Sequence, residues 1–190
     1  MRDSPPATPT SYRYPWGNAY FNITACSTGP GYEKEHDMYC WATTCGVDSP
    51  PADCFVESAT TTKLCQHGAS ECALNAVEGC AIMLNPDWTV HMPFVTCAEA
   101  GGSTASCATA ASIDGAAITA CTNNATAMAI VDKYSAYATA KLGKAKLGTP
   151  WVMLNGAPAL QDPVADLVSA VCKAYTGSPK PAACSGVEKL

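Results

Sequence analysis

Hydrophobic residues recur at helical spacing within and after the chain's densest group of cysteine, histidine and acidic residues, which spans residues 65–80. From Glu71 onward the pattern predicts a helix, with Ser70 as its N-cap and Glu71 in the first turn, where a negative charge favours the helix dipole. Its apolar face comprises Leu74, Val77, Ala81 and Leu84. Asn85 and Pro86 end the helix, because proline cannot continue it.

The last forty residues carry the most readable pattern. Residues 151–154 predict a short apolar strand that ends at the turn-forming pair Asn155-Gly156. Asp162 then caps a helix whose first residue is Pro163. The apolar stripe of this helix comprises Val164, Leu167, Val168, Val171 and Tyr175. Gly177 stands where a C′ residue belongs, so the whole segment predicts a strand, a hairpin turn and an amphipathic helix.

Between these regions the sequence favours helices. Residues 97–121 are rich in Ala, Ser and Gly and predict short helices. Residues 124–142 predict one longer helix with Gly143 as its C-cap. Its apolar positions are Met128, Val131, Ala138 and Leu142. Residues 90–96 fit either a strand or a helix, because Pro93 lies in their middle.

Two stretches lack such periodicity. Residues 1–13 are rich in Pro, Ser and Thr and predict a disordered lead-in. Residues 25–64 hold four cysteines among Gly, Pro, Thr and Asp, and they contain little apolar surface to order them. These cysteines are Cys26, Cys40, Cys45 and Cys54. We therefore expect a long irregular loop held by its own disulfides.

The cysteine count indicates the compartment. Twelve cysteines spread along the whole chain are typical of disulfide-bonded proteins in an oxidising environment. The other eight are Cys65, Cys72, Cys80, Cys97, Cys107, Cys121, Cys172 and Cys184. Two glycosylation sequons, at Asn22 and Asn124, agree with a glycoprotein of the secretory pathway. Residues 1–9, however, contain no apolar stretch of the kind that a signal peptide needs, so no signal peptide is visible.

Charge and hydropathy exclude two classes of partner. The net charge is −5 with a pI near 5.0, and no basic patch is visible, which argues against nucleic acid. No apolar run reaches the roughly 20 residues that span a bilayer, so we expect no membrane span. With 190 residues the chain is long enough for one domain with a substantial core.

The cysteine-rich segment 65–80 is open to two chemical interpretations. On one helix, Cys72 and Cys80 lie ~12 Å apart, whereas a disulfide needs Cα atoms within roughly 7 Å, so each pairs elsewhere and the segment does not close on itself. The same distance argues against a zinc site formed by Cys65, His67, Cys72 and Cys80, and we expect no metal and no other cofactor. An acid–base pair is one interpretation of His67 and Glu71, but without a nucleophile nearby we favour loop and capping roles for them, and a backbone hydrogen bond for the Asn75 amide.

The same residues resemble a known family. Cys65-Gln66-His67-Gly68-x-x-Glu71-Cys72-x-x-Asn75-x4-Cys80 is similar to the signature of the gamma-interferon-inducible lysosomal thiol reductases (GILT). Further similarity lies in Tyr14-Pro15-Trp16-Gly17-Asn18-Ala19, in Pro150-Trp151-Val152-x-x-Asn155-Gly156 and from Val171-Cys172 to Cys184. The resemblance covers residues 14–24 and 65–185, and residues 25–64 look like an insertion.

The resemblance implies an α/β, thioredoxin-like fold with a helical, disulfide-rich insertion and no cofactor. On this basis residues 14–190 form one domain, in which 25–64 are a cysteine-rich loop, 65–145 the helical insertion and 146–190 the C-terminal strand, hairpin and helix. In such folds the proline of Thr149-Pro150 is cis and its loop faces the substrate. The implied activity is the reduction of disulfide-bonded protein substrates in endosomes and lysosomes.

The chain departs from the family at the reactive dithiol. In the family a Cys-x-x-Cys pair at a helix N-terminus attacks the substrate disulfide, and this chain contains no Cys-x-x-Cys. Cys40-x4-Cys45 has the wrong spacing to replace it, and a structural disulfide is the better interpretation. We therefore expect the N-terminal strand–helix unit to be missing and this chain to be inactive as a reductase. The alternative is a secreted, disulfide-stapled protein that binds without catalysis on the same scaffold.

Overall fold

The computed structural model describes residues 19–26, 34–59, 61–65, 67–142, 152–154, 157–160 and 167–186. They fall into two compact units, one within residues 11–146 and one within residues 147–190. Each unit is described by itself. The described residues are mostly helical and hold two small sheets and six disulfides.

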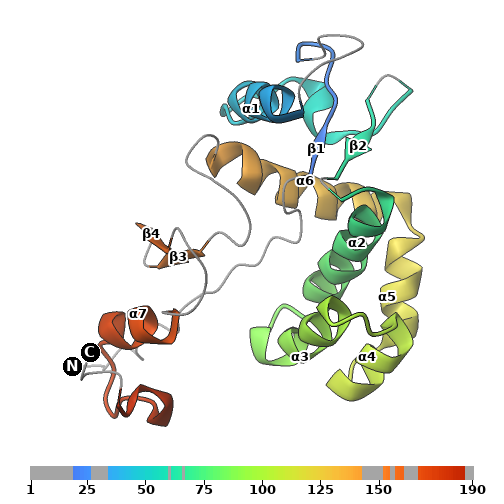
Figure 1. Ribbon diagram of the computed structural model, residues 1–190. Coiled ribbons are helices and arrows are strands. Elements are labelled where there is room, and N and C mark those ends of the chain that lie inside the picture. The colour runs from blue at the N-terminus through green and yellow to red at the C-terminus, as the bar shows by residue number, and fades with distance from the viewer. Residues whose placement is uncertain are drawn as a thin grey trace, which may run out of the picture. The chain divides into compact units, whose positions relative to one another are not determined.

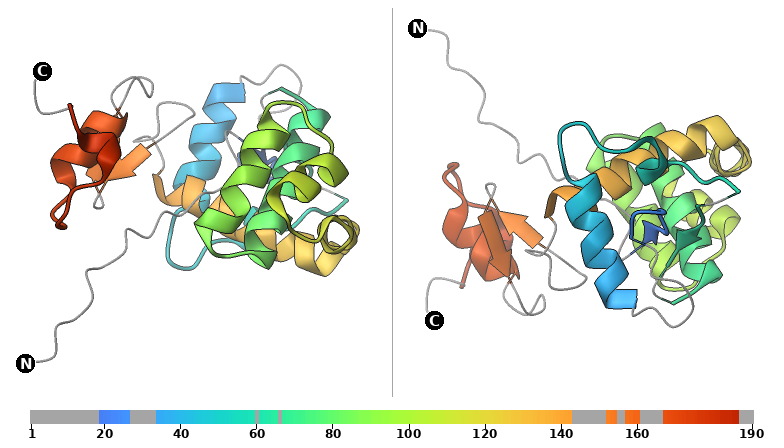
Figure 2. Two further views of the ribbon diagram at one scale, coloured as in Figure 1. Left: turned by 90° about the horizontal axis from the view of Figure 1, so that it is seen from below. Right: turned by 90° about the horizontal axis from the view of Figure 1, so that it is seen from above.

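The larger unit is organised around its longest helix, α6. Its elements in order are β1 (Tyr20–Phe21), α1 (Lys34–Cys45), the 3-10 helix η1 (Ala52–Phe55), β2 (Lys63–Leu64), α2 (Ala69–Leu84), α3 (Trp88–Glu99), α4 (Thr104–Ala111), α5 (Gly115–Thr122) and α6 (Ala125–Leu142). Helix α6 lies between α1 with the short β1–β2 pair on one side and the α2–α5 bundle on the other (Figure 1). Figure 2 shows α1 lying against α6 in both perpendicular views.

The core of this unit consists of two separate hydrophobic clusters. The first, called the N-terminal cluster, comprises Ala19, Tyr20, Phe21, Ile23, Cys26, Trp41, Ala42, Cys45, Cys54, Phe55, Ala136 and Ala140. The second, called the bundle cluster, comprises Cys80, Ala81, Phe94, Val95, Ala98, Cys107, Ala108, Ile118 and Cys121. The C-terminal half of α6 supplies Ala136 and Ala140 to the first cluster, and its first turns pack Ala127 and Met128 against the second. One helix therefore supports both clusters.

Helices α3 to α6 begin at side-chain caps. Asp87, Ser103 and Asp114 accept backbone N–H groups at the starts of α3, α4 and α5. Asn124 does the same for α6, accepting from Thr126 and Ala127 at 3.0 and 3.1 Å. The short helices predicted over residues 97–121 and the long helix over 124–142 are confirmed. Residues 90–96, which were ambiguous, are helical, with Pro93 inside α3 and exposed to solvent.

The predicted irregular loop over residues 25–64 is wrong in its central part, because residues 34–45 form α1 and residues 52–55 form η1. Trp41 orders this segment: its side chain is fully buried, packs edge-on against Phe55 and donates its indole N–H to the carbonyl oxygen of Cys54 at 3.3 Å. Two disulfides within the segment, Cys26–Cys40 and Cys45–Cys54, connect α1 to its flanks. The apolar contacts that stabilise α1 come from α6, far along the chain.

The smaller unit contains the predicted hairpin and helix. Strands β3 (Val152–Leu154) and β4 (Ala157–Leu160) pair antiparallel, with Val152 opposite Leu160 and Leu154 opposite Ala157. Helix α7 (Leu167–Ala174) follows, and the Cys172–Cys184 disulfide links it to the 3-10 helix η3 (Ala182–Cys184). The strand prediction is confirmed at residues 152–154. The predicted positions of this unit that lie outside the described residues are Thr149, Pro150, Trp151, Asn155, Gly156, Asp162, Pro163 and Val164. Gly143, the predicted C-cap of the helix over residues 124–142, also lies outside them.

The predicted C-terminal end of α7 is wrong. The helix ends at Ala174, so Tyr175 is not part of its apolar stripe and Gly177 is not its C′ residue. Gly177 instead accommodates the Tyr175 ring, because a Cβ on residue 177 would lie 2.5 Å from the Tyr175 hydroxyl oxygen. The strands of the described residues form two separate two-stranded sheets, and the thioredoxin-like part of the predicted fold remains a prediction.

Candidate functional site

The signature segment, residues 65–80, follows strand β2 (Lys63–Leu64) and enters helix α2 through a turn at one glycine. Strand β2 ends at Leu64, Cys65 follows, and α2 begins at Ala69. Gly68 is the N-cap, with φ 95° and ψ −165°, a backbone conformation that only glycine adopts readily. The predicted N-cap, Ser70, is therefore wrong, because Ser70 already lies inside the helix. Gly68 closes the turn with its N–H donated to the carbonyl oxygen of Cys65 at 3.1 Å.

The tight turn closes a disulfide within the segment. Cys65 and Cys72 are bonded, with their Cα atoms 5.7 Å apart, and Cys80 pairs with Cys121 of α5. The geometric prediction that Cys72 and Cys80 cannot pair is confirmed. The further expectation that the segment does not close on itself is wrong, because the turn at Gly68 brings the end of β2 back over the first turn of α2.

His67 and Glu71 take the predicted loop and capping roles. The Glu71 carboxylate accepts the backbone N–H of His67 at 2.6 Å, and its Oε2 lies 3.4 Å from the His67 Nδ1. The imidazole is 75% exposed, so the pair lies on the surface at the helix N-terminus. The Asn75 Nδ2 does not make the predicted backbone hydrogen bond: it is buried and has no hydrogen-bond partner among the described residues.

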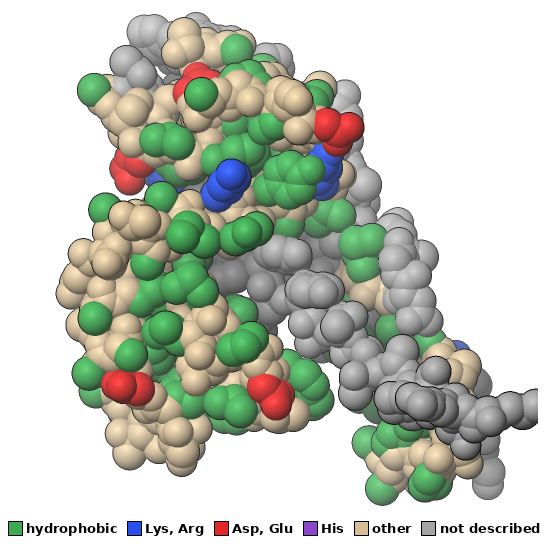
Figure 3. All heavy atoms as spheres, turned by 180° about the vertical axis from the view of Figure 1, so that it is seen from behind, with side chains coloured by type: hydrophobic (Ala, Val, Ile, Leu, Met, Phe, Trp, Pro, Cys, Tyr) green, Lys and Arg blue, Asp and Glu red, His purple; other side chains and the backbone are tan. Residues whose placement is uncertain are grey.

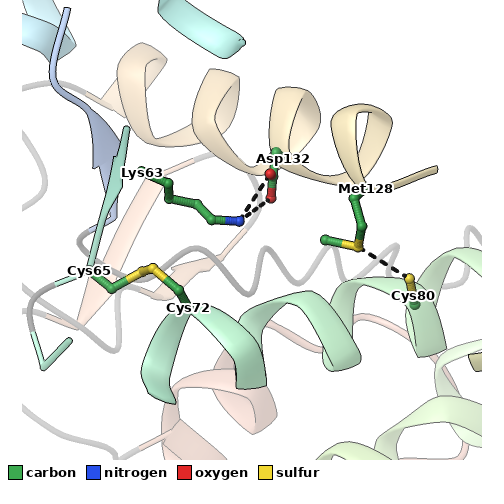
Figure 4. Close-up of polar contacts among 6 residues, drawn as sticks. All are labelled: Lys63, Cys65, Cys72, Cys80, Met128 and Asp132. Carbon is green, nitrogen blue, oxygen red and sulfur yellow. Dashed lines mark hydrogen bonds and ion pairs between the residues drawn. A yellow bond between two sulfur atoms is a disulfide. The ribbon is translucent and has the colours of Figure 1, made fainter. Parts of the chain in front are cut away.

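An ion pair fixes strand β2, which directly precedes the signature segment, to α6. The Lys63 Nζ donates to both carboxylate oxygens of Asp132, at 3.1 and 3.0 Å (Figure 4). The two side chains are only 15% and 13% exposed. Burial raises the pKa of Asp132, and the Lys63 charge opposes that rise without cancelling it. Sequence analysis missed this pair, because the partners are 69 residues apart; the only local signal is an aspartate on the inner face of the predicted helix 124–142.

A disulfide and a sulfur–sulfur contact fix the helical part of the signature segment to α5 and α6. The Cys80–Cys121 disulfide connects α2 to α5, and the Met128 Sδ lies 3.6 Å from the Cys80 Sγ. Figure 4 shows Met128 on α6 pointing down toward Cys80 on α2, with the Lys63–Asp132 pair further along the same helix. Cys80 is fully buried. The predicted apolar face of α2 is confirmed at Leu74, Val77 and Ala81, but Leu84 is 44% exposed.

The remaining predicted site residues lie apart from this segment. Asn22 bridges β1 and β2: its Oδ1 accepts the backbone N–H and the hydroxyl of Thr62, while Asn124 caps α6 on the surface. Thr149, Pro150 and Gln66 lie outside the described residues. Cys40 and Cys45 are both bonded to other cysteines, so they do not form a dithiol with each other.

All twelve cysteines are paired, and no free cysteine remains. Among the described residues no three His, Cys, Asp or Glu side chains lie close enough to share a metal ion. Figure 3 shows the bundle face covered mainly by hydrophobic and uncharged polar side chains with scattered acidic ones, and the sequence contains no Lys or Arg between residues 64 and 132. No helix in the described part of the chain is both long enough and apolar enough to span a membrane. These features define a mostly helical protein stabilised by disulfides, whose signature segment is oxidised.

Comparison with known proteins confirms the resemblance to the GILT family. The sequence model of the family described as "Gamma interferon inducible lysosomal thiol reductase (GILT)" matches residues 49–125. The chain is 37% identical over 123 residues to the "Gamma-interferon-responsive lysosomal thiol protein" of Arabidopsis thaliana. The aligned region covers 63% of this chain and 52% of that protein. The chain thus spans about half the length of the curated relative it matches. No solved structure matches.

Proposed function

We propose that this chain is part of a GILT-type thiol–disulfide oxidoreductase that reduces disulfide-bonded proteins in the lysosomal or secretory pathway. The observation that carries the proposal is the signature segment 65–80, which lies inside the matched residues 49–125. The name of the Arabidopsis relative supports a lysosomal thiol chemistry. Six disulfides agree with an oxidising compartment on the route to the lysosome or the cell exterior.

The 190-residue chain by itself does not reduce disulfides under this proposal. A thiol reductase needs a free thiolate to attack the substrate disulfide and a second thiol to resolve the mixed disulfide. This sequence contains no Cys-x-x-Cys, and every cysteine is paired. The part of the chain that we propose to face an extended substrate is the loop at Thr149-Pro150.

An insulin-reduction assay at pH 5 and pH 7 tests both statements. The 190-residue chain is compared with the protein isolated from its natural source, identified by peptides from residues 49–125. We expect no turnover by the chain and turnover by the natural protein. Turnover by the chain alone contradicts the proposed inactivity, and an inactive natural protein contradicts the reductase function and favours the non-catalytic binding protein.

The modification state is a further part of the proposal. Asn124 is exposed, and its Oδ1 caps α6 while its Nδ2 makes no hydrogen bond within the described residues. Asn22 is half-buried and its Oδ1 joins two strands. We expect a glycan on Asn124 more readily than on Asn22. Digestion of the natural glycoprotein with an endoglycosidase that leaves one sugar, followed by peptide mass analysis, measures the occupancy of each site.

A further inference from the structure

The Cys65–Cys72 disulfide differs from the other five in its exposure. Each of the other five contains at least one buried cysteine, and in three of them both cysteines are buried. Neither Cys65 nor Cys72 is buried. The loop between them is exposed at His67, Gly68 and Ala69. A thiol in solution can therefore approach either cysteine of this disulfide without prior unfolding, whereas Cys26–Cys40 and Cys97–Cys107 each offer one half-buried cysteine and the other three pairs offer none.

The position of this disulfide limits the structural effect of its reduction to the neighbouring residues. Cys65 packs against the N-terminal cluster, and Cys72 lies in the first turn of α2, the helix that carries the bundle cluster. Without the bond, Cys80–Cys121 still holds α2 to α5, and the Lys63–Asp132 ion pair still holds β2 to α6. The disulfide is thus a covalent strap between two clusters, each of which keeps its own cross-links.

We propose that Cys65–Cys72 is a redox-exchange site that accepts two electrons from a thiol reductant while the other five disulfides remain intact. This goes beyond the proposed reductase function, since here the chain is reduced rather than reducing. The shared chemistry of the partner is a thiolate, supplied either by a small thiol such as free cysteine or by a protein dithiol.

The two sulfur atoms of this disulfide have different roles in the exchange, one as the site of attack and the other as the leaving group. A reductant thiolate attacks the Cys65 Sγ, the Cys65–Cys72 bond breaks, and Cys72 leaves as a thiolate in the first turn of α2, where the helix dipole favours negative charge. A second reductant thiolate then attacks the reductant's sulfur in the mixed disulfide and releases the Cys65 thiolate. Both cysteines take up protons, and the two reductant thiols are oxidised to one disulfide.

Graded reduction of the fully oxidised chain tests the proposal. One arm uses free cysteine and the other uses reduced thioredoxin, each followed by acid quenching, alkylation and peptide mapping. We expect Cys65 and Cys72 to be alkylated at least about tenfold faster than any other cysteine. Selective reduction in either arm supports the proposal and identifies the source of the thiolate. No reduction in both arms, another pair opening first, or all twelve cysteines reacting together overturns it.

Two further measurements test the direction and the local effect. A glutathione adduct trapped by rapid acid quenching is expected on Cys65, and an adduct on Cys72 contradicts the assigned direction. Hydrogen exchange of the selectively reduced chain is expected to increase in β2 and the first turn of α2 but not in α3, α4 or α5. The C65S/C72S double variant is the control: it must lack the fast alkylation phase and keep the other five disulfides. Increased exchange throughout the bundle would refute a local strap.

Discussion

The Lys63–Asp132 ion pair leads to the most specific prediction, because its two partners respond to mutation in opposite directions. Burial is the largest influence on the pKa of Asp132 and raises it, so the folded state favours the neutral carboxyl group. A folded-state pKa above the unfolded value means that the folded protein binds more protons. The contribution of Asp132 to stability is therefore fully present below pH 3.8 and is lost as the pH rises through the raised pKa.

Asp132→Asn replaces the carboxyl group by a permanently neutral group of the same shape. We expect the variant to match the wild type at pH 3 and to be more stable than the wild type at pH 7. Lys63→Met keeps the aliphatic stem but leaves the carboxylate without its bidentate partner. Breaking a buried pair costs about 3–5 kcal/mol. Because the two side chains are still 15% and 13% exposed, we expect Lys63→Met to cost about 3 kcal/mol at pH 7.

The cost of Lys63→Met has an upper limit that depends on pH. In the Lys63→Met variant, Asp132 can take up a proton rather than remain an unpaired buried charge. This protonation costs about 1.4 kcal/mol for each unit by which the pH exceeds the pKa of Asp132. The destabilisation must therefore shrink as the pH falls toward that of an acidic compartment. Lys141→Met is the matched control, because its Asp48 partner is fully exposed, and we expect no measurable change.

Urea unfolding of the wild type and the three variants at pH 3, 5 and 7 measures these differences. Destabilisation by Asp132→Asn at pH 7 but not at pH 3 would show that attraction to Lys63 outweighs the cost of burial. The reasoning would then be wrong. A pH-independent cost for Lys63→Met would likewise show that lost packing, and not charge, dominates.

Three further predictions have defined outcomes. Gly46→Ala places a Cβ 2.5 Å from the Ala140 carbonyl oxygen, so overpacking is expected to cost about 1–3 kcal/mol in urea unfolding; an unchanged midpoint would show that α1 and α6 separate freely. Removing Cys65–Cys72 is expected to cost about 2.5 kcal/mol and removing Cys80–Cys121 about 4 kcal/mol, because the second closes a longer loop; the reverse order by calorimetry contradicts the chain-entropy argument. Asp87→Ala is expected to lower the thermal midpoint more at pH 7 than at pH 2, since the Thr89 hydroxyl and backbone hydrogen bonds lower the Asp87 pKa; an equal loss at both pH values would refute the charge-dependent cap.

Features encoded by neighbouring residues were predictable from the sequence. The stop of α2 at Asn85-Pro86, the helix after Asn124 and the apolar strand at Val152 each follow from a local cap, breaker or run of hydrophobic residues. Distant contacts were not predictable. Helix α1 has little apolar periodicity of its own and depends on Trp41 and on α6, so a local pattern showed only a loop.

The candidate site likewise contains some features that the sequence predicted and others that it did not. Helical rise alone excluded a Cys72–Cys80 bond, and the structure agrees. The Cys65–Cys72 bond depends on the unusual backbone angles of Gly68, which no spacing rule indicates. Asp132 was missed because its partner is distant in sequence, and the Nδ2 of Asn75 is buried without the hydrogen bond that its polarity led us to expect.

The shared helix α6 also has a consequence for synthesis. The bundle cluster can assemble from helices that follow one another, whereas the N-terminal cluster needs Ala136 and Ala140, which leave the ribosome well after the other members of that cluster. During that delay Cys26, Cys40, Cys45 and Cys54 have no completed core to select their partners. We therefore expect nascent chains to form mispaired bonds in this region first, and a disulfide isomerase to shorten their oxidative maturation more than that of the bundle.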